Sequence, residues 1–320
     1  MIGLFVFVVC LIILLVLAYI LVTSECYPAV LRYDEENFFF DPITKSKIPF
    51  PSLYESPSVK LSVIIPAYNE EERLPRMLEE CLKYLEDVSH LGNESSYEVI
   101  IVDDGSKDKT TEVALNYSKK FGCDKVRVLS LTKNRGKGGA VRLGVLSSRG
   151  RQLLFADADG ATTFEDITKL QLSLERITEG DQSGNSQGLV CGSRAHLEEE
   201  AIASRSLIRT FLMKGFHFLV WLLAARSIRD TQCGFKLLTR STARLCFPNL
   251  HIEKWAFDVE LIYIAEHFKV PLDEVAVRWT EIEGSKIVPV LSWLQMGRDL
   301  VLLWLRYTTG AWKLRIEGNY

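Results

Sequence analysis

The sequence lacks an excess of charge of either sign and lacks closely spaced pairs of cysteines. Lys and Arg number 38 against 41 Asp and Glu, giving a formal net charge of -3. Because nucleic-acid-binding proteins are usually clearly basic, we expect no nucleic-acid partner. The seven cysteines are scattered and include no Cys-x-x-Cys pair, which argues against structural zinc and against a secreted disulfide framework. A reducing compartment is the simpler expectation for most of the chain.

A second absence is local, since residues 1–24 contain no charged side chain. Residues 2–22 are almost entirely Val, Leu, Ile and Phe, and as a helix of about 31 Å they would cross a hydrocarbon core of about 30 Å. The alternative is a cleaved signal peptide ending near Ser24. Against it, no Lys or Arg precedes the apolar run, which also exceeds the roughly 7–15 residues usual for signal peptides. We predict a retained transmembrane anchor at residues 1–24.

Residues 25–59 are predicted to form a Pro-rich tether. They hold five of the ten prolines, and repeated proline prevents a continuous helix or a central strand. Arg32 is the one basic residue close behind the anchor, so the positive-inside rule gives little information on membrane orientation. The orientation is therefore inferred from the reducing compartment that the scattered cysteines indicate. We expect the bulk of the chain on the cytosolic side, where the sequons at Asn93 and Asn116 go unused.

From Lys60 onward, short apolar runs alternate with amphipathic segments. Strands are predicted at 61–65, 98–102, 126–131, 153–156 and 189–192, and helices at about 74–85, 110–121, 138–147 and 164–177. Strands that are apolar throughout indicate a sheet that helices cover on both faces. In such α/β folds, ligands bind beyond the carboxyl ends of the strands.

Polar or glycine-rich loops follow the first four predicted strands. They read Pro66-Ala-Tyr-Asn-Glu70, Asp103-Asp-Gly-Ser106, Asn134-Arg-Gly-Lys-Gly-Gly139 and Asp157-Ala-Asp159. Any one of them is compatible with ordinary turn chemistry, but turn chemistry alone does not account for all four in order. Together they predict a ligand site at one edge of the sheet.

Asp157 and Asp159 form the sharpest of these motifs. Two carboxylates one residue apart at a strand end can converge on a hard cation, and oxygen ligands favour Mg²⁺ or Mn²⁺, which hold diphosphates. The alternative is a solvated acidic turn. The loop at 136–139 begins a helix, so its N–H groups and Lys137 are candidates for the same phosphates. It is not a P-loop, because no Ser or Thr follows Lys137.

In this order, the four motifs resemble the inverting nucleotide-sugar glycosyltransferases of family 2, which have the GT-A fold. Gly192-Ser-Arg194, the DTQCGFK segment at 230–236 and the WAFDVE segment at 255–260 are similar to the branch acting on polyprenyl phosphates, and to its eukaryotic members that glucosylate dolichyl phosphate. The resemblance spans about 60–279. It implies a Rossmann-like nucleotide-binding sheet covered by helices, with a transferase core at 60–245 and an acceptor- and membrane-associating region at 246–320.

The resemblance also implies roles for individual residues. UDP-glucose, the implied donor, would contact Pro66, Tyr68, Asn69, Glu70, Asp103, Asp104, Lys137 and Gly138. Asp157 and Asp159 would hold Mg²⁺ or Mn²⁺ and serve catalysis together with Arg194, although Ala161 stands where some relatives supply a third ligand. Dolichyl phosphate, the implied acceptor, would contact Arg194, Arg205, Arg209, Asp230 and Lys236. For Arg205 and Arg209 the alternative is a solvated basic face.

The implied reaction is an inverting transfer that gives dolichyl β-D-glucosyl phosphate, a glucose donor for N-glycan precursors, and UDP. Its nucleophile is an ionised phosphate, so no general base is strictly required. The implied location is the endoplasmic reticulum membrane, with one span, a cytosolic catalytic domain and, as one option, a homo-oligomer. Apolar segments at 207–225 and 287–304, with Trp221, Trp293 and Trp304, are candidates for amphipathic helices at the membrane interface. The alternative for them is core packing.

Three other functions remain open from the residues. A processive polysaccharide synthase would carry a Gln-x-x-Arg-Trp motif, whereas here Gln295-Met-Gly-Arg298 is followed by Asp299. A transferase of mannose or another sugar to the same lipid is a second alternative. A membrane-tethered nucleotide-binding adaptor without catalysis is the third, and the intact Asp157-Ala-Asp159 argues against it.

Overall fold

The structure, a computed structural model, describes residues 1–90, 96–197, 215, 219–220, 223, 226–282 and 289–316, with the backbone alone described at 2, 3, 5, 6, 9, 12, 13 and 289–294. Its centre is a seven-stranded sheet of order β5-β4-β3-β6-β8-β7-β9. The strands are β3 (Val59–Ala67), β4 (Tyr97–Asp103), β5 (Val126–Ser130), β6 (Gly150–Ala156), β7 (Leu189–Ser193), β8 (Phe235–Thr239) and β9 (Leu272–Ala276). Neighbours from β5 to β6 are parallel, whereas β8 runs antiparallel to both β6 and β7.

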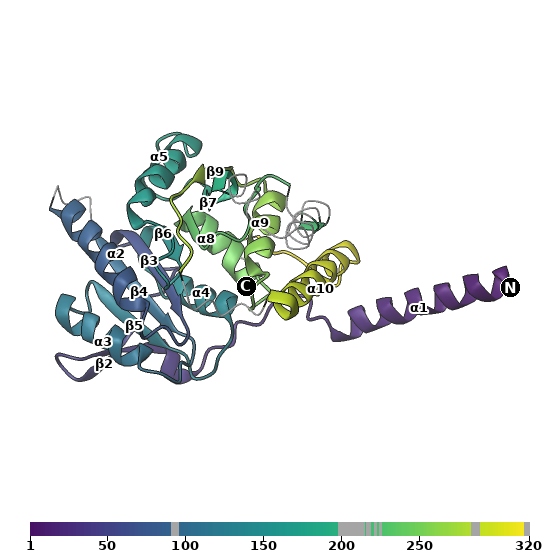
Figure 1. Cartoon of the computed structure of the whole chain (residues 1–320), viewed down its shortest axis with the longest axis horizontal. Helices are drawn as coiled ribbons and strands as arrows, with labels where there is room; N and C mark the ends of the chain where they lie inside the picture. Colours follow the sequence, from purple (N-terminus) through teal and green to yellow (C-terminus); the bar gives the residue numbers. More distant parts are fainter. Residues whose placement is uncertain are drawn as a thin grey trace.

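Helices cover both faces of this sheet, as the uniformly apolar strands predicted. Helices α2 (Leu74–Ser89), α3 (Thr110–Phe121) and α5 (Ile167–Ile177) pack on one face. Helices α4 (Lys137–Leu146), α8 (Arg240–Cys246), α9 (Phe257–His267) and α10 (Pro289–Thr308) lie on the other (Figure 1). Because side chains alternate along a strand, Val63 and Ile65 of β3 enter the first core and Ile64 enters the second. The predicted α/β architecture is therefore confirmed.

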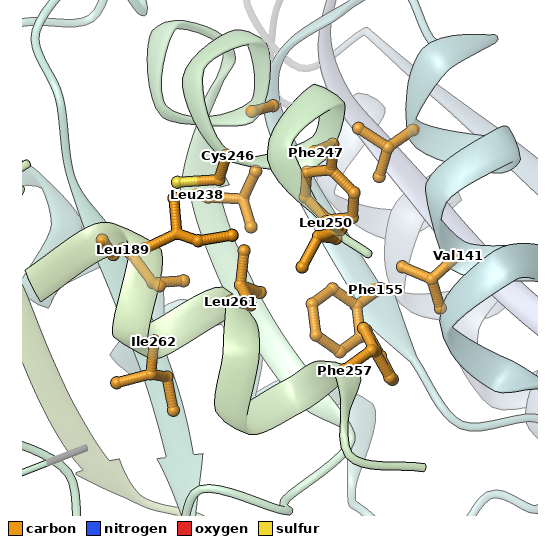
Figure 2. Packing of buried hydrophobic residues seen from close by; sticks show 14 of the residues in the cluster. Val141, Phe155, Leu189, Leu238, Cys246, Phe247, Leu250, Phe257, Leu261 and Ile262 are labelled. Carbon is orange, nitrogen blue, oxygen red and sulfur yellow. The ribbon is translucent and has the colours of Figure 1, made fainter. Parts of the chain in front are cut away.

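The second core joins α4 and α9 to the middle of the sheet. Phe155 of β6 and Phe257 of α9 approach each other beside Val141 of α4 (Figure 2), with ring centroids 5.8 Å apart. All three side chains are at most 1% exposed, so each contributes roughly 1.5–3 kcal/mol of hydrophobic stabilisation. This packing fixes the starts of α4 and α9, which both border the site described below.

The first nine predicted elements all form, with boundaries that differ by a few residues. The predicted helix at 164–177 begins as a 3₁₀ turn, η3 (Phe164–Asp166), before α5. Two strands, β8 and β9, were not among the predictions. The strands from β5 to β6 are thus parallel, and β8 introduces antiparallel pairing into the rest of the sheet. Strand β8 also brings the DTQCGFK segment beside β6.

The segment predicted to be a tether carries short secondary structure of its own. A 3₁₀ turn η1 (Asp34–Asn37) precedes strands β1 (Phe38–Asp41) and β2 (Ser46–Pro49), which pair in an antiparallel hairpin. Phe39 and Leu53 are buried, and the Arg127 guanidinium lies 4.9 Å from the centroid of the Phe39 ring. The segment therefore packs on the core, with β1 in contact with β5.

Residues Ile2–Thr23 form helix α1, which projects from the body of the molecule with its carboxyl end near α10 (Figure 1). Across the described residues, no helix meets the combined length and hydropathy expected of a membrane span. The anchor at 1–24 therefore stays a prediction. Helix α10 buries Leu300 and Leu303 while Val301 and Trp304 are about two-fifths exposed, at 41% and 40%, an amphipathic pattern. The segment at 207–225 lies mostly outside the described residues.

Candidate active site

A cavity of about 590 Å³ opens at the carboxyl ends of β3, β4 and β6. The strand register explains its position, because Ala67 of β3 is paired with Asp103 of β4, and Ile64 of β3 with Phe155 of β6. The loops that leave these strands therefore emerge side by side. Segments from the carboxyl-terminal third, around Trp255, Trp279 and Met296, form the rest of the wall.

Asp157 and Asp159 leave β6 and both lie on the cavity wall. The Asp157 N–H donates to the carbonyl of Gly234 at 3.1 Å, and the Asp157 carboxylate lies directly over the Cα of that glycine. A Cβ on residue 234 would come within 3.0 Å of three atoms of the carboxylate, closer than real Cβ atoms approach other atoms. Glycine at 234 is therefore a steric condition for the position of Asp157, which gives the DTQCGFK segment a specific role.

The two carboxylates repel each other electrostatically. Burial raises the pKa of Asp159, and the nearby charge of Asp157 raises it further. One oxygen of Asp159 accepts the N–H of Ala161 at 3.0 Å. Two carboxylates that repel each other in a half-buried site favour the binding of a cation between them.

Lys137, the first residue of α4, supplies one such cation. Its Nζ lies 2.6 Å from an Asp157 oxygen and 5.9 Å from the centroid of the Trp255 ring. Burial by itself lowers the pKa of Lys137, but Asp157 and Asp258 outweigh it and raise that pKa overall. Lys137 therefore lies beside the Asp157-Ala-Asp159 motif, and its assignment to the donor phosphates stays a prediction.

The donor set also suits a divalent metal ion. Asp157 and Asp159 present carboxylate oxygens to one cavity, and hard oxygen ligands select Mg²⁺ or Mn²⁺. Among the described residues, no group of three or more His, Cys, Asp or Glu side chains is arranged to hold a metal. Ala161 lies on the wall where a further ligand would stand. The two residues therefore fit a metal that takes its remaining ligands from water or from a diphosphate.

The predicted donor-binding residues divide into two groups. Pro66, Tyr68 and Glu70 lie on the cavity wall, and Glu70 pairs with Arg73 through oxygen–nitrogen distances of 2.5 and 2.6 Å. Asn69 lies behind them, with a positive φ of 55°. Its side-chain oxygen accepts the N–H of Lys107 at 2.8 Å, so Asn69 joins the loops after β3 and β4.

Asp103 and Asp104 also differ in whether they reach the cavity wall. Asp103 accepts hydrogen bonds from the Ser106 N–H, at 2.9 Å, and from the Thr111 hydroxyl, which shape the turn into α3. Asp104 lies on the cavity wall and accepts the N–H groups of Arg135 and Gly136 at 2.7 and 2.8 Å. Burial raises the pKa of Asp104 to about 6 despite these hydrogen bonds. Asp104 thus combines a ligand-facing position with support of the next loop.

Two N–H groups of the glycine-rich loop are bound within the protein. Gly136 has φ of 88°, which favours glycine, and its N–H is bound by Asp104. The Gly139 N–H donates to the Glu253 carbonyl at 2.9 Å. Gly138 packs against Phe257, whose Cβ would be 2.5 Å from a Cβ at 138. Close packing of α4 on α9 therefore requires glycine at 138, and the assignment of Gly138 to the donor stays a prediction.

Arg194 reaches the cavity at the end of β7. Its guanidinium forms a fork with the Asp230 carboxylate at 2.7 and 2.9 Å and lies 5.5 Å from the centroid of the Trp279 ring. Burial acts to lower the pKa of Arg194, but the contact with Asp230 raises that pKa overall. For Asp230, burial acts to raise the pKa, but the contact with Arg194 lowers it overall. Asp230 therefore orients Arg194 and is not itself placed toward a ligand.

Lys236 was predicted to contact the acceptor, and the structure places it elsewhere. Its side chain is 0% exposed, and its Nζ lies 2.5 Å from an Asp258 oxygen and 2.7 Å from the Cys233 carbonyl. A buried ammonium needs such partners because desolvation is otherwise costly. The cavity instead receives Asp258. Arg205 and Arg209, the other predicted acceptor residues, lie outside the described residues.

Sequence reasoning missed several wall residues from the carboxyl-terminal third. They are Gln232, Lys254, Trp255, Asp258, Trp279, Ile282, Gln295 and Met296. Trp255 and Asp258 belong to the WAFDVE segment, so a signal was present, but it carried no spacing that pointed to a role. The wall of the cavity combines carboxylates, the cations Lys137 and Arg194, and tryptophan and aliphatic side chains. Such a cavity can bind a nucleotide diphosphate and bring a second, amphipathic anion against it.

Comparison with known proteins agrees with this chemistry. The profile described as "Glycosyl transferase family 2" matches residues 62–244. The chain is 60% identical over 297 residues to a Drosophila melanogaster protein named dolichyl-phosphate beta-glucosyltransferase, covering 93% of this chain and 90% of the relative. A Homo sapiens protein of the same name is 56% identical over 292 residues, covering 91% and 89%. The solved structure of M. tuberculosis glucosyl-3-phosphoglycerate synthase aligns with 76% of this chain and 78% of its own at 18% identity and a TM-score of 0.49.

Proposed function

The chain belongs to glycosyl transferase family 2 with a GT-A-like α/β fold, and we propose that it transfers glucose from UDP-glucose to dolichyl phosphate. The observation that carries the proposal is the 60% identity, over nine-tenths of both chains, to a relative named dolichyl-phosphate beta-glucosyltransferase. The cavity carboxylates and cations described above supply the chemistry that this reaction needs.

In the proposed reaction, an oxygen of the dolichyl phosphate attacks the anomeric carbon of glucose from the face opposite UDP. The new bond joins that oxygen to the anomeric carbon, and the bond from this carbon to the β-phosphate oxygen breaks. UDP leaves with the bonding electrons. Because the attack comes from the face opposite UDP, the configuration at the anomeric carbon changes from α to β. The attacking phosphate is already ionised at neutral pH, so the step needs no proton acceptor.

The residues around Asp157 would act on the donor diphosphate. Lys137 lies at the start of α4, where its charge stabilises the negative charge that grows on the leaving UDP. Arg73 is a second cation on the wall and is oriented by Glu70. Asp157 and Asp159 would hold a divalent cation, which supplies further charge neutralisation of the diphosphate when bound. Tyr68 and Asp104 border the part of the cavity that would take the nucleoside.

Arg194 would receive the acceptor phosphate. The fork to Asp230 occupies two of its nitrogens, and the remaining N–H donors are available to a phosphate oxygen. Trp279 lies beside Arg194, and Trp279, Ile282 and Met296 on the cavity wall would provide apolar surface for the lipid. A preoriented guanidinium loses little freedom when it binds phosphate.

We propose further that the enzyme works at the cytosolic face of the endoplasmic reticulum membrane, with α1 as its single anchor. Support comes from the apolar composition of residues 2–22 and from the lipid nature of the acceptor. The amphipathic exposure of Val301 and Trp304 on α10, close to the carboxyl end of α1, supports contact between this end of the molecule and the bilayer.

The test is incubation of membranes containing the protein with radiolabelled UDP-glucose and dolichyl phosphate. We expect an acid-labile, alkali-resistant lipid glucoside that is absent with the Asp157→Ala variant. GDP-mannose in parallel should give no product. A mannolipid, or nucleotide binding without any glycolipid, would contradict the proposed function.

A further inference from the structure

Glu36 is a fully buried carboxylate that the proposed reaction does not use. It lies in the segment between α1 and the core, and its side chain is 0% exposed. One of its oxygens accepts the N–H and the hydroxyl of Thr132, both at 3.0 Å. The other accepts the N–H of Tyr33 at 3.0 Å and an N–H of the Arg135 guanidinium at 2.7 Å.

These contacts keep the Glu36 carboxylate ionised. Burial alone would raise the pKa of Glu36, but the hydrogen bonds from Thr132 and Tyr33 and the charge of Arg135 lower it overall. Among the described residues, the hydrogen-bond partners of the Glu36 carboxylate are all donors, and two of them, Thr132 and Arg135, belong to the loop between β5 and α4. The buried Glu36 carboxylate therefore binds this loop through Thr132 and Arg135.

Arg135 is attached to the same amino-terminal segment by further contacts. Its guanidinium donates to the Leu31 carbonyl and lies 5.4 Å from the centroid of the Tyr33 ring. It is 7% exposed, so loss of its partner would leave a charge with little access to water. The backbone of Glu36 is fixed in turn by Arg32, which also donates to the Ser147 hydroxyl at the end of α4.

The opposite side of this loop faces the cavity. The Arg135 and Gly136 N–H groups donate to Asp104 on the cavity wall, and the next residue, Lys137, contacts Asp157. Two carboxylates therefore hold the loop: Asp104 binds its backbone at the cavity wall, and Glu36 binds the Arg135 side chain. Both contacts lie immediately before Lys137, the residue that contacts Asp157.

We propose that Glu36 is a positioning residue for the donor site: through Arg135 and Thr132, it sets the loop that places Lys137 and the Asp104 hydrogen bonds, so the segment following α1 is an integral part of nucleotide binding. The inference rests on the proposed function in taking the cavity ligand to be a nucleoside diphosphate. It assigns a role in the donor site to residues that lie outside the matched family region, 62–244.

A matched control exists at the other end of the same segment. The Arg244 guanidinium donates to the carbonyls of Leu53 and Glu55 at 2.9 and 3.0 Å and holds residues 53–55 against α8. Neither of these two hydrogen bonds involves Glu36 or the loop at 132–136. Arg244→Ala therefore loosens the segment without changing what Glu36 contacts.

The experiment measures UDP binding by calorimetry to the full-length protein in detergent with Mn²⁺ present. Glu36→Gln keeps the size of the side chain but places an amide NH₂ or a neutral oxygen against the Arg135 and Tyr33 donors. We expect the Kd for UDP to rise about tenfold, the equivalent of one charge-assisted hydrogen bond. Arg244→Ala should lower the unfolding temperature and change that Kd by less than about twofold.

A double-mutant cycle separates positioning from general destabilisation. Combined with Arg135→Met, Glu36→Gln should cost little more UDP affinity than either change alone, because both act through one contact. Arg135→Lys, a milder change, should shift the Kd in the same direction and serves if Glu36→Gln does not fold. Unaltered UDP affinity in a folded Glu36→Gln or Arg135→Lys protein, or equal losses with Arg244→Ala, would overturn the inference. If the wild-type protein failed to bind UDP, the proposed function itself would fall instead.

Discussion

Replacing Gly234 by Ala tests how the carboxylates of the site are positioned. The new Cβ would meet three atoms of the Asp157 carboxylate within 3.0 Å, whereas ordinary contacts of a Cβ begin near 3.4 Å. The backbone at 234 is not among the positive-φ positions, so alanine fits the main-chain conformation. The strain therefore falls on Asp157 and leaves the fold intact.

The magnitude follows from the displacement. The Asp157 carboxylate must retreat by roughly 1 Å, and a misplacement of about that size in a reacting constellation costs on the order of 10²-fold in rate. Such a loss corresponds to about 2.7 kcal/mol in the activation free energy. It should appear in kcat with UDP-glucose and dolichyl phosphate, together with weaker binding of Mn²⁺ in the presence of UDP.

Gly297→Ala is the control, because a Cβ at 297 meets no atom within 4 Å and alanine suits the interior of α10. The control should keep wild-type turnover, and both variants should keep the wild-type circular dichroism spectrum. Turnover within a factor of about three of wild type in Gly234→Ala would refute the argument, because the Asp157 carboxylate could then move without consequence for the reaction.

Three further predictions concern the same cavity. Asp157→Asn or Asp159→Asn should lower kcat by about 10²–10³-fold, and EDTA should abolish transfer until Mg²⁺ or Mn²⁺ is restored; turnover in excess EDTA would contradict a metal site. Arg194→Lys loses the fork to Asp230, so the KM for dolichyl phosphate should rise about tenfold while the KM for UDP-glucose stays constant; equal changes in both would count against acceptor binding. Burial raises the pKa of Asp104 from 3.8 to about 6, so proton uptake favours the folded state and this stabilisation is lost as pH rises through 6. Urea unfolding should therefore show the wild type gaining about 1 kcal/mol relative to Asp104→Asn between pH 7 and pH 5; a constant difference would contradict the shift.

The parallel part of the fold was predictable because its signals are local. Strand β3 is apolar at every buried position except Ser62, and α2 carries its buried residues at helical spacing, so each element is recognisable without its neighbours. Strand β8 carries no such signal, since the DTQCGFK segment before it is polar and its antiparallel pairing with β6 depends on long-range contacts. The docking of residues 25–59 also depends on long-range contacts, because Phe39 and Leu53 give no periodic pattern.

In the candidate site, strand-end position identified Asp157, Asp159, Asp104 and Lys137, which all lie on the cavity wall. Residue type alone left the role of Gly138 open. It was assigned to phosphate binding because glycine-rich helix starts bind anions, and the structure adds a close contact with Phe257 that also requires glycine. Whether a glycine serves a ligand or a neighbouring helix depends on what packs opposite it, and a single sequence does not contain that information.

The charged residues obey a physical constraint that their sequence positions do not reveal. Lys137, Arg194 and Lys236 were each assigned to an anionic ligand, yet each forms an ion pair, with Asp157, Asp230 and Asp258 respectively. A cation held away from water needs a partner before any ligand arrives, so exposure decides which cations also serve a ligand. Arg194 is 30% exposed, Lys137 is 11% and Lys236 is 0%. A phosphate can therefore approach Arg194 beside its existing partner, and a diphosphate must share Lys137 with Asp157. Lys236 is left to hold Asp258 in the wall.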